Sequence, residues 1–586
     1  MVILKTITMK NLHNLKKLAV CLLTIAMLPS CKKYLEEKPY DIISPENLQS
    51  SPEGVKQMVT GMYGVFFNAA MFQNESWMYL TFCDNEWTDG VEWVMGTYGV
   101  GNFTGGWMYN NPGNDPYYVF YRLVRAANGV LDVLPNAKFS PEQMYLKTQY
   151  EGEALTLRSL AYFFLVQMYG ALPLHLHTDD PATMPRSSIK DVYAQIIKDL
   201  HTAEDKLYLN SKRPSSIPRG HFTKGAAQLL LAKVYNTMGS GSLAGGQVTV
   251  PTHITRTPDG DIVREVVHVN KNKVAGYDFD SKTAYDSAIA VANRLIATKE
   301  YEMESYANTW NPKNYGGKDF IFALETDSAY ASATTKFNMF MTPVGLKGSG
   351  WLHYTKDLFY LYEPTDERAL YGIAHEYKSY NLLPNGIWMR YFFPSEDSMY
   401  YYQMYGKGNA IPDANSNSCY LMKWYLGNTE SPQVNLNGDN ASAVNTTPTQ
   451  NYPFLRYTEA FFILAEAENE AKGPTTAAFD ALDLIKSYRF QPGFTTVDRS
   501  MNQEQLRSYI LEERTREFIG EDYRRFDLIR WGIYLDVMNA VGIRKPYLDS
   551  DMQSISKKRE QKHLLYPVPT TEIDGNTAFG PNNPGW

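Results

Sequence analysis

Blocks of helical periodicity make up much of this chain, and they favour a mainly α fold. Apolar side chains recur at helical spacing near residues 52–69, 117–134, 144–169, 188–207, 222–238, 282–299, 455–472, 476–488, 502–519 and 523–531. Several blocks alternate small and large apolar residues, as in Ala226, Leu230, Ala232 and Tyr235. This alternation favours helices that pack closely against a partner helix. We therefore expect paired helices to form the frame of the molecule.

The arrangement of these helices leaves two alternatives open. Helix pairs with small residues at their contacts resemble tetratricopeptide units, which stack side by side along a chain. Here, however, the pairs are interrupted and do not follow a strict period of about 34 residues. An ordinary helical bundle fits the same pattern equally well.

Long inserts separate the helical blocks, at about 72–115, 239–281, 303–350 and 376–452. They hold most of the tryptophans and much of the Gly, Asn and Pro. Loops this long are uncommon in compact proteins unless they carry a function. We expect short strands inside them, for instance at 320–325, where the sequence reads Phe-Ile-Phe-Ala-Leu-Glu. A helical frame with aromatic-rich loop inserts is an arrangement suited to binding.

The N-terminus has the features of a bacterial lipoprotein signal peptide. Four lysines accompany an apolar core at 18–28, which is too short to span a bilayer but suits a signal peptide. The sequence Leu-Pro-Ser-Cys at 28–31 closes this core and resembles a lipobox. We expect removal of residues 1–30, acylation of Cys31 (for instance with palmitate), a tether over 31–50 and a single domain over 51–586. An ordinary secretory signal with a chance cysteine is the alternative. Acyl chains on Cys31 would attach the protein to a membrane surface without a spanning segment.

The charge of the mature chain argues against several partners. The leader carries four lysines and no acidic residue, so its removal lowers the net charge from −7 to −11. An acidic chain is poorly suited to nucleic acid or to anionic lipid headgroups. After the leader, no run of about 18 apolar residues is available to span a membrane. Cys83 and Cys419 are the other cysteines of the mature chain, and the sequence leaves open whether they pair.

No catalytic or metal-binding motif stands out. The segment 239–242 lacks the Gly-x-Ser-x-Gly order of a nucleophile elbow, and His375-Glu376 lacks the second histidine of a zinc helix. Segments 278–280 and 435–439 have calcium-binding residue types but miss the bidentate glutamate of a calcium loop. Two carboxylates for glycoside hydrolysis are impossible to single out among 63 acidic residues. We expect a binding protein without cofactor or metal, and not an enzyme.

Three segments resemble signatures of the SusD/RagB family of Bacteroidetes outer-membrane lipoproteins. The first is 153–174, with Arg158, a Tyr-Phe pair, Tyr-Gly and a proline exit. The second is 512–532, and the third is the C-terminus, with Tyr-Pro-Val-Pro at 566–569 and Asn-Asn-Pro-Gly-Trp at 582–586. Together with the lipobox, these segments occur in the family's order from one end of the chain to the other.

This resemblance implies a SusD-like fold and a role at the cell surface. Members of the family capture nutrients at the outer membrane and pass them to a SusC-like TonB-dependent transporter. We therefore expect glycan binding and carbohydrate uptake, with the protein anchored by lipid and facing outward. The helical face would contact the transporter, and the aromatic inserts would hold the glycan. The RagB branch implies peptide cargo as the alternative, and a lipid-anchored enzyme that cleaves glycans is a further class.

The segment 513–530 concentrates charges of both signs. Its acidic and basic residues recur at spacings of three and four, which allow ion pairs along a helix. Acid–base catalysis is the other interpretation, but no histidine, serine or metal ligand lies nearby in the sequence. We expect a salt-bridge network that clamps the C-terminal helices, and a structural role of the same kind for Arg158.

Aromatic residues in the inserts are the candidates for a glycan site. Sugar rings pack their C–H faces on aromatic planes, whereas their hydroxyls need amide, carboxylate or guanidinium partners. The candidate ligand residues come from three parts of the chain: Trp87, Trp93, Asn102, Trp107, Trp310 and Trp351. Neighbouring glycines favour exposure of Trp107 and Trp351. The alternative is that each tryptophan packs its insert onto the helices. These inserts would converge on one face of the molecule.

Overall fold

A computed structural model describes the chain from residue 51 to residue 586. Its gaps are at 68–80, 89–96, 106–107, 312–313, 315, 327–339, 344–349, 364, 375, 383–387, 394–418, 425–435, 438–450, 491–492, 522 and 545–554. The signal peptide, Cys31 and the tether over 31–50 lie outside the described residues. Their assignment, and that of a single domain over 51–586, stays a prediction.

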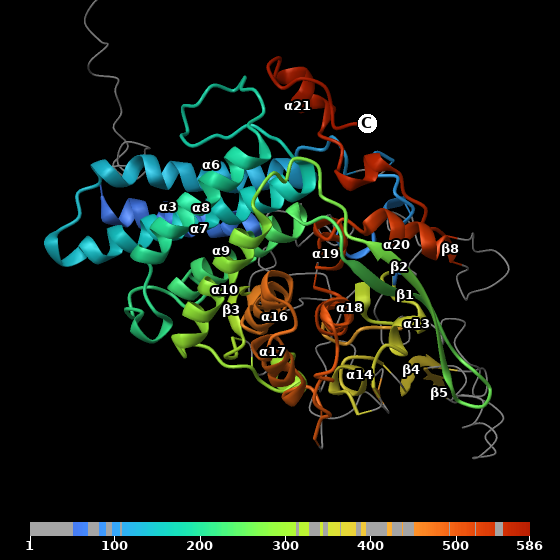
Figure 1. The fold of residues 1–586 in the computed structure, drawn as a ribbon. Helices are drawn as coiled ribbons and strands as arrows, with labels where there is room; N and C mark the ends of the chain where they lie inside the picture. The colour runs from blue at the N-terminus through green and yellow to red at the C-terminus, as the bar shows by residue number, and fades with distance from the viewer. Residues whose placement is uncertain are drawn as a thin grey trace, which may run out of the picture.

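Helices packed in series form the first part of the molecule (Figure 1). They are α3 (Pro52–Gly64), α6 (Pro116–Val133), α7 (Met144–Tyr169), α8 (Ile189–Lys206), α9 (Lys224–Ser242) and α10 (Ser281–Ala297). Each of the helices from α6 to α10 packs on the next, while α3 packs on α6 and α7. α7 is buried along most of its length and lies between its neighbours. Stacking of successive helices is typical of helix-pair repeats.

Local sequence explains where several of these helices begin and end. Asp115, Ser188 and Asp280 are N-caps whose side chains accept a hydrogen bond from a backbone N–H of the first turn. Pro116 follows the first of these caps, at a position where a proline costs no helical hydrogen bond. Gly170 ends α7 with a φ of 74°, a left-handed conformation that favours glycine.

The second part contains the C-terminal helices together with short helices and strands. The longer helices are α16 (Thr458–Lys472), α17 (Thr476–Ser487), α18 (Gln503–Phe518), α19 (Arg524–Arg530) and α20 (Tyr534–Val541). The short ones are α11 (Tyr306–Thr309), α13 (Lys356–Phe359), α14 (Glu367–Leu370) and α21 (Thr570–Gly575). α16 packs on α10 and joins the two parts. Among the described residues, no helix combines the length and the apolar character that crossing a membrane requires.

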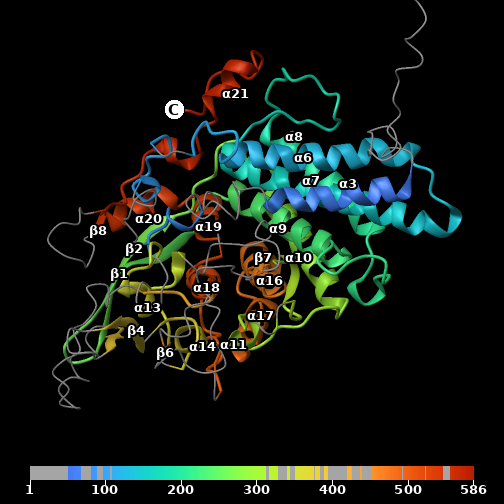
Figure 2. The same cartoon turned by 180° about the vertical axis from the view of Figure 1, so that it is seen from behind.

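The strands are short and form small separate sheets, visible from both sides in Figures 1 and 2. β1 (Gln247–Arg256) and β2 (Ile262–Asn270) make an antiparallel hairpin with a bulge between Pro251 and His253. β3 (Phe320–Leu324) pairs antiparallel with β7 (Tyr452–Arg456). β4 (Glu376–Leu382) pairs antiparallel with β5 (Trp388–Phe392) and parallel with β6 (Leu436–Asn437). β8 (Ile543–Arg544) pairs antiparallel with β9 (Ile555–Ser556).

The mainly α fold and the positions of the predicted helices are confirmed to within a few residues, and β3 confirms the strand predicted at 320–325. α9 differs, because the sequence predicts its end at 238 and the helix continues to Ser242. Its last turn contains two glycines that look like helix breakers. A Cβ on Gly239 would lie 2.9 Å from the ring of Tyr285, and one on Gly241 would lie 2.5 Å from the ring of Tyr277. These glycines allow close packing against tyrosine rings and do not end the helix.

Candidate functional site

Two of the candidate ligand residues belong to the core, and the prediction is wrong for them. Trp87 and Trp310 expose 1% and 5% of their surface. A buried ring presents no face to a sugar, so neither tryptophan is a stacking platform in this structure. Trp93 and Trp107 lie outside the described residues. Trp351 is half-buried and Asn102 is exposed, and both remain candidates.

The segment before Trp87 is acidic in sequence but buried in the structure. Asp84 and Glu86 are fully buried. Arginines that follow more than 400 residues later neutralise them: Arg525 and Arg559 pair with Asp84, and Arg524 pairs with Glu86. Buried carboxylates are tolerated when cations pair with them in this way. The acidic run is therefore no sign of an exposed loop, and Trp87 is buried together with it.

Trp310 lies in a buried cluster of rings and cations. Its ring centroid is 5.4 Å from that of Trp424, 5.1 Å from Lys423 Nζ and 5.5 Å from the guanidinium carbon of Arg456. A cation near the face of an aromatic ring is attracted by the electrons of that ring. Lys423 and Arg456 also form ion pairs with Glu521. Trp310 thus packs its insert onto a charged network instead of facing solvent.

Trp351 is partly exposed and packs against the edge of the core. Its ring stacks on Phe340 with centroids 5.0 Å apart and an angle of 27° between the planes. Gly350 precedes it with a φ of 61°, and the Gly350 N–H donates to the carbonyl of Thr342 at 3.0 Å. A ring already held by a neighbour loses little conformational freedom when a ligand stacks on it. Trp351 is therefore the aromatic candidate with the most favourable position among the described residues.

Segments from the first and fourth inserts meet beside the segment that carries Trp351, and they do so through the backbone. Tyr354 forms isolated β-bridges with Thr88 and with Cys419. The Tyr354 N–H donates to Cys419 O at 2.9 Å, and the Cys419 N–H donates to Tyr354 O at 2.8 Å. The N–H of Thr355 donates to Trp87 O at 2.8 Å. These bonds bring distant parts of the chain together, and Trp87 stays buried beside them.

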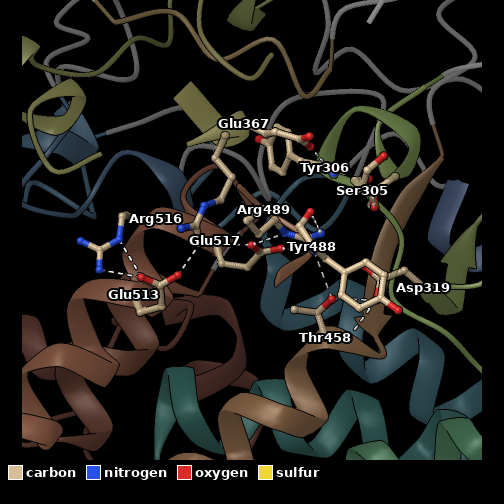
Figure 3. A network of polar contacts seen from close by, with 12 residues as sticks. Ser305, Tyr306, Asp319, Glu367, Thr458, Tyr488, Arg489, Glu513, Arg516 and Glu517 are labelled. Carbon is tan, nitrogen blue, oxygen red and sulfur yellow. Dashed lines mark hydrogen bonds and ion pairs between the residues drawn. The ribbon is translucent and has the colours of Figure 1, made fainter. Parts of the chain in front are cut away.

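A network of buried arginines and carboxylates connects segments of the second part (Figure 3). Glu517 on α18 accepts hydrogen bonds from Arg489 Nε at 2.9 Å and from Arg456 Nη2 at 2.8 Å. A third cation, Arg368, approaches the same carboxylate at 3.4 Å. All four side chains are fully buried. Arg456 also reaches Asp319 at 2.7 Å, so that the network joins α18 to the segment before β3.

The arginines keep these carboxylates ionised. Burial alone would raise the pKa of Glu517, but the charges of Arg489 and Arg456 lower it well below its ordinary value. Burial likewise opposes ionisation of Glu513, yet Arg368 and Arg516 lower its pKa to about 2. A general acid needs a proton near neutral pH, and a carboxylate with such a pKa holds none. The predicted salt-bridge network is confirmed, and its geometry is that of a structural clamp.

The partners in this network differ from those that helical spacing indicates. Arg516 does pair with Glu513 within α18 at 2.6 Å. Most of the other partners are distant in sequence. Arg530, for example, pairs with Glu466 on α16 in addition to Asp527 on its own helix. Sequence reasoning missed several cations of the network: Arg368, Lys423, Arg456 and Arg489. Each is an isolated basic residue beside an insert or a short element, and no local pattern marks it.

Arg158 plays the predicted structural role in the helical part. Its Nε and Nη2 donate to the carboxylate of Asp199 on α8 at 2.8 and 3.0 Å. Its Nη1 donates to Asn128 Oδ1 on α6 at 2.9 Å and to the carbonyl of Leu176 at 3.0 Å. One buried side chain therefore joins α7 to α6, to α8 and to the segment that follows α7.

Metal and thiol chemistry gain no support from the arrangement of side chains. Within the described ranges, no group of three or more His, Cys, Asp or Glu side chains is placed to hold a metal ion. Cys83 and Cys419 are buried and not bonded to each other, which answers the question that the sequence left open. Burial raises the pKa of both thiols above its ordinary value. A buried thiol of this kind is unreactive.

Two family models match different parts of the chain. The model described as the SusD family matches residues 318–586. The model described as starch-binding and associating with the outer membrane matches residues 33–236. The first match includes the buried network around Glu517, and the second includes most of the helical part.

Relatives match nearly the whole chain. It is 22% identical to SusD-like protein P25 of Formosa agariphila over 563 residues, which cover 94% of this chain and 95% of that protein. A SusD homolog from Bacteroides thetaiotaomicron has a similar structure, with a TM-score of 0.69 and 20% identity over 92% of this chain and 98% of that one. Surface glycan-binding protein A from Bacteroides fluxus has a TM-score of 0.63 and 15% identity over 92% of this chain and 100% of its own. The structures share the fold.

Proposed function

Because this chain belongs to the SusD/RagB family, we propose that it is an outer-membrane lipoprotein that captures oligosaccharides and delivers them to a SusC-like TonB-dependent transporter. The observation that carries the proposal is the match of residues 33–236 to a model described as starch-binding and associating with the outer membrane. The Bacteroides fluxus protein of similar fold is itself named for glycan binding. Both point to sugar as the cargo.

The chemistry of the described surface supports a sugar ligand. The stack of Trp351 on Phe340 offers an aromatic plane to the C–H face of a sugar ring. Asn102 is exposed and supplies an amide, which both donates and accepts hydrogen bonds from hydroxyls. Trp93 and Trp107 stay candidates from the sequence alone. Capture followed by release requires moderate affinity, because a ligand held too tightly would not move on to a transporter.

Attachment and delivery complete the proposal. Acyl chains on Cys31 would hold the protein at the outer membrane, and each buried methylene contributes about 0.8 kcal/mol to that anchoring. The helical part would contact the transporter, since its helices lie at the opposite end of the molecule from β4 and β5 (Figures 1 and 2). The inserts would then face outward and meet the glycan first.

Binding of the lipid-free protein, residues 32–586, to plant, microbial and host-mucin glycans tests this proposal. We expect saturable binding to at least one glycan by calorimetry. Loss of one stacked ring removes on the order of 1 kcal/mol, so Trp351→Ala and Trp107→Ala should weaken binding about fivefold at a true platform. Trp586→Ala is the matched control, because that half-buried indole packs against Phe103 and His563 near the C-terminus.

The outcomes separate the alternative functions. Binding that survives in the control and weakens in a platform variant supports the glycan site. Binding to peptides with no response to any glycan would replace oligosaccharide by peptide cargo. Release of shorter sugars over time, followed by chromatography, would reveal a glycan-cleaving enzyme and overturn the proposal.

A further inference from the structure

A cavity of about 260 Å³ lies between α6, the segment that follows α7, and α21. Tyrosines from α6 form its aromatic lining, and none of the candidate tryptophans takes part. Its polar lining combines guanidinium, amide, imidazole and carboxylate groups: Arg125, Asn128, His175, Asp180 and Glu572. Ligand pockets usually measure about 300 Å³ or more, so a cavity of this size suits a ligand of a single ring.

The aromatic lining is fixed in position. The ring centroid of Tyr117 is 4.8 Å from that of Tyr121 and 5.8 Å from that of Tyr118. Tyr121 meets His175 edge to face at 5.9 Å, and its hydroxyl donates to the carbonyl of Pro173 at 2.8 Å. Tyr117 is buried, whereas Tyr118 and Tyr121 are partly exposed. The cavity therefore has aromatic rings whose orientation is set before any ligand arrives.

Two charged groups at the cavity are not used in ion pairs within the described part of the chain. Arg125 is exposed and has no acidic partner there. Glu572 is partly buried, has no cationic partner there, and burial raises the pKa of its carboxyl above the ordinary value. A guanidinium and a carboxyl group in such positions are available for charge-assisted hydrogen bonds to hydroxyl groups. Most of the arginines described in the second part, in contrast, already form ion pairs with carboxylates.

Hydrogen bonds hold the walls of the cavity in place. The carbonyl of His175 accepts from Asn128 Nδ2 at 3.1 Å and from the hydroxyl of Tyr162 at 2.8 Å. Asp180 accepts from the backbone N–H groups of residues 176 and 177 at 2.6 and 2.9 Å. On the other side, Asn576 Nδ2 donates to the carbonyl of Met184 at 2.9 Å and ties the end of α21 to the same loop. Because these walls are already ordered, ligand binding loses little free energy to ordering the site.

We propose that this cavity, called the α6 pocket below, binds the terminal residue of a sugar chain. Tyr118 and Tyr121 would pack on the sugar ring, and Arg125 and Glu572 would bond to its hydroxyls. Three segments line the pocket from different sides, so one residue at a chain end fits it better than the middle of a chain. The choice of ligand rests on the proposed function, but the pocket is separate from Trp351 and from the inserts.

Titration of the lipid-free protein with single sugars tests the α6 pocket. The probes are glucose, galactose, mannose, xylose, glucosamine and glucuronic acid, and binding is read by saturation-transfer NMR. We expect at least one of them to bind saturably, and Arg125→Ala/Glu572→Gln to weaken that binding at least tenfold. Arg499→Ala/Asp480→Asn is the control, because it removes one positive and one negative charge from another surface, where Arg499 pairs with Asp480 and with Asp483.

A second measurement uses the parent protein and therefore needs no folded variant. Phenylglyoxal modifies exposed guanidinium groups, and the sugar that binds should slow modification of Arg125 at least fivefold while leaving Arg499 unaffected. No saturable binding, or equal binding by the pocket variant, would overturn the α6 pocket. Glycan binding that is lost only in Trp351→Ala, with no response to single sugars, would leave the proposed function standing and reject the pocket alone. Saturable binding of a single sugar in the pocket, with no binding of any longer glycan, would support the α6 pocket and reject the proposed function.

Discussion

The helical part and the second part of the molecule are stabilised in different ways. From α6 to α10, successive helices bury apolar faces against one another, and α7 is surrounded by them. Around α18 and α19, buried arginines and carboxylates connect helices to inserts and short strands. A helix satisfies its own backbone and needs only an apolar stripe to pack. Irregular segments lack that repeat and need directed bonds, so the charged network connects α18 and α19 to segments without helical periodicity.

The largest effect should come from removing the centre of the network. Glu517→Ala would leave Arg456 and Arg489 buried without their shared carboxylate, and we expect it to lower the free energy of unfolding by about 3–5 kcal/mol. Urea unfolding followed by circular dichroism measures this. Asp480→Asn, at an exposed ion pair, is the control and should change stability little. An equally small effect of Glu517→Ala would show that the second part does not depend on its ion pairs.

A smaller loss is expected for the corresponding change in the helical part. Arg158→Met removes the cation beside Asp199, but Gln195 Nε2 still donates to that carboxylate at 2.7 Å. Apolar contacts of α7 also remain, so we expect a loss of about 2–3 kcal/mol in the same urea experiment. A loss greater than that of Glu517→Ala would reverse the comparison between the two parts.

Close helix packing predicts the next effect. A Cβ on Gly152 in α7 would lie 2.8 Å from Leu207 Cγ, so Gly152→Ala should lower the free energy of unfolding by about 1–3 kcal/mol. Gly61 in α3 has open space around its Cα, and Gly61→Ala should instead raise stability by roughly 0.5–1 kcal/mol because alanine favours helix. Thermal unfolding of both variants checks the pair. Equal shifts in the same direction would mean that packing of α7 is looser than the structure indicates.

The two parts should also respond to pH in opposite directions. The pKa of Glu513 is lowered to about 2, so its contribution to stability is present above about pH 4.5 and is lost as the pH falls toward 2. Burial raises the pKa of Asp115, the N-cap of α6, to about 7. Its contribution is therefore complete below about pH 4 and is lost as the pH rises through 7.

Asp115→Asn tests the second half of this contrast. Asparagine keeps the cap of α6 but does not ionise, so the variant should gain stability relative to the parent between pH 5 and pH 8. Urea unfolding at a series of pH values measures the difference. Parallel profiles of parent and variant would mean that the Asp115 carboxyl titrates normally in the folded protein.

Much of the helical frame could be predicted from the sequence, because the apolar residues that each helix buries recur at helical spacing. The network could not, since a residue such as Arg456 meets Glu517, which lies 61 positions further along the chain, only once the segment between them has folded. The same limit explains Trp87, whose acidic neighbours look exposed until Arg559 is placed beside them. Tyr118 and Glu572 of the α6 pocket are likewise brought together by the fold. The local sequence pattern identifies helices and strands. Contacts between residues that are distant in sequence determine which of their side chains remain exposed to solvent.

The pairing of Asp84 with Arg559 has a consequence for the order in which the protein assembles. The two residues are 475 positions apart, so during synthesis Asp84 stays in water until almost the entire chain has emerged. The stacked helices need no such delay, because their partners are neighbours in sequence. Maturation of the first insert is therefore a late event. A chain interrupted before Arg559 would leave the buried Asp84 with Arg525 as its remaining arginine partner, and incompletely paired folding intermediates of this kind are prone to aggregate.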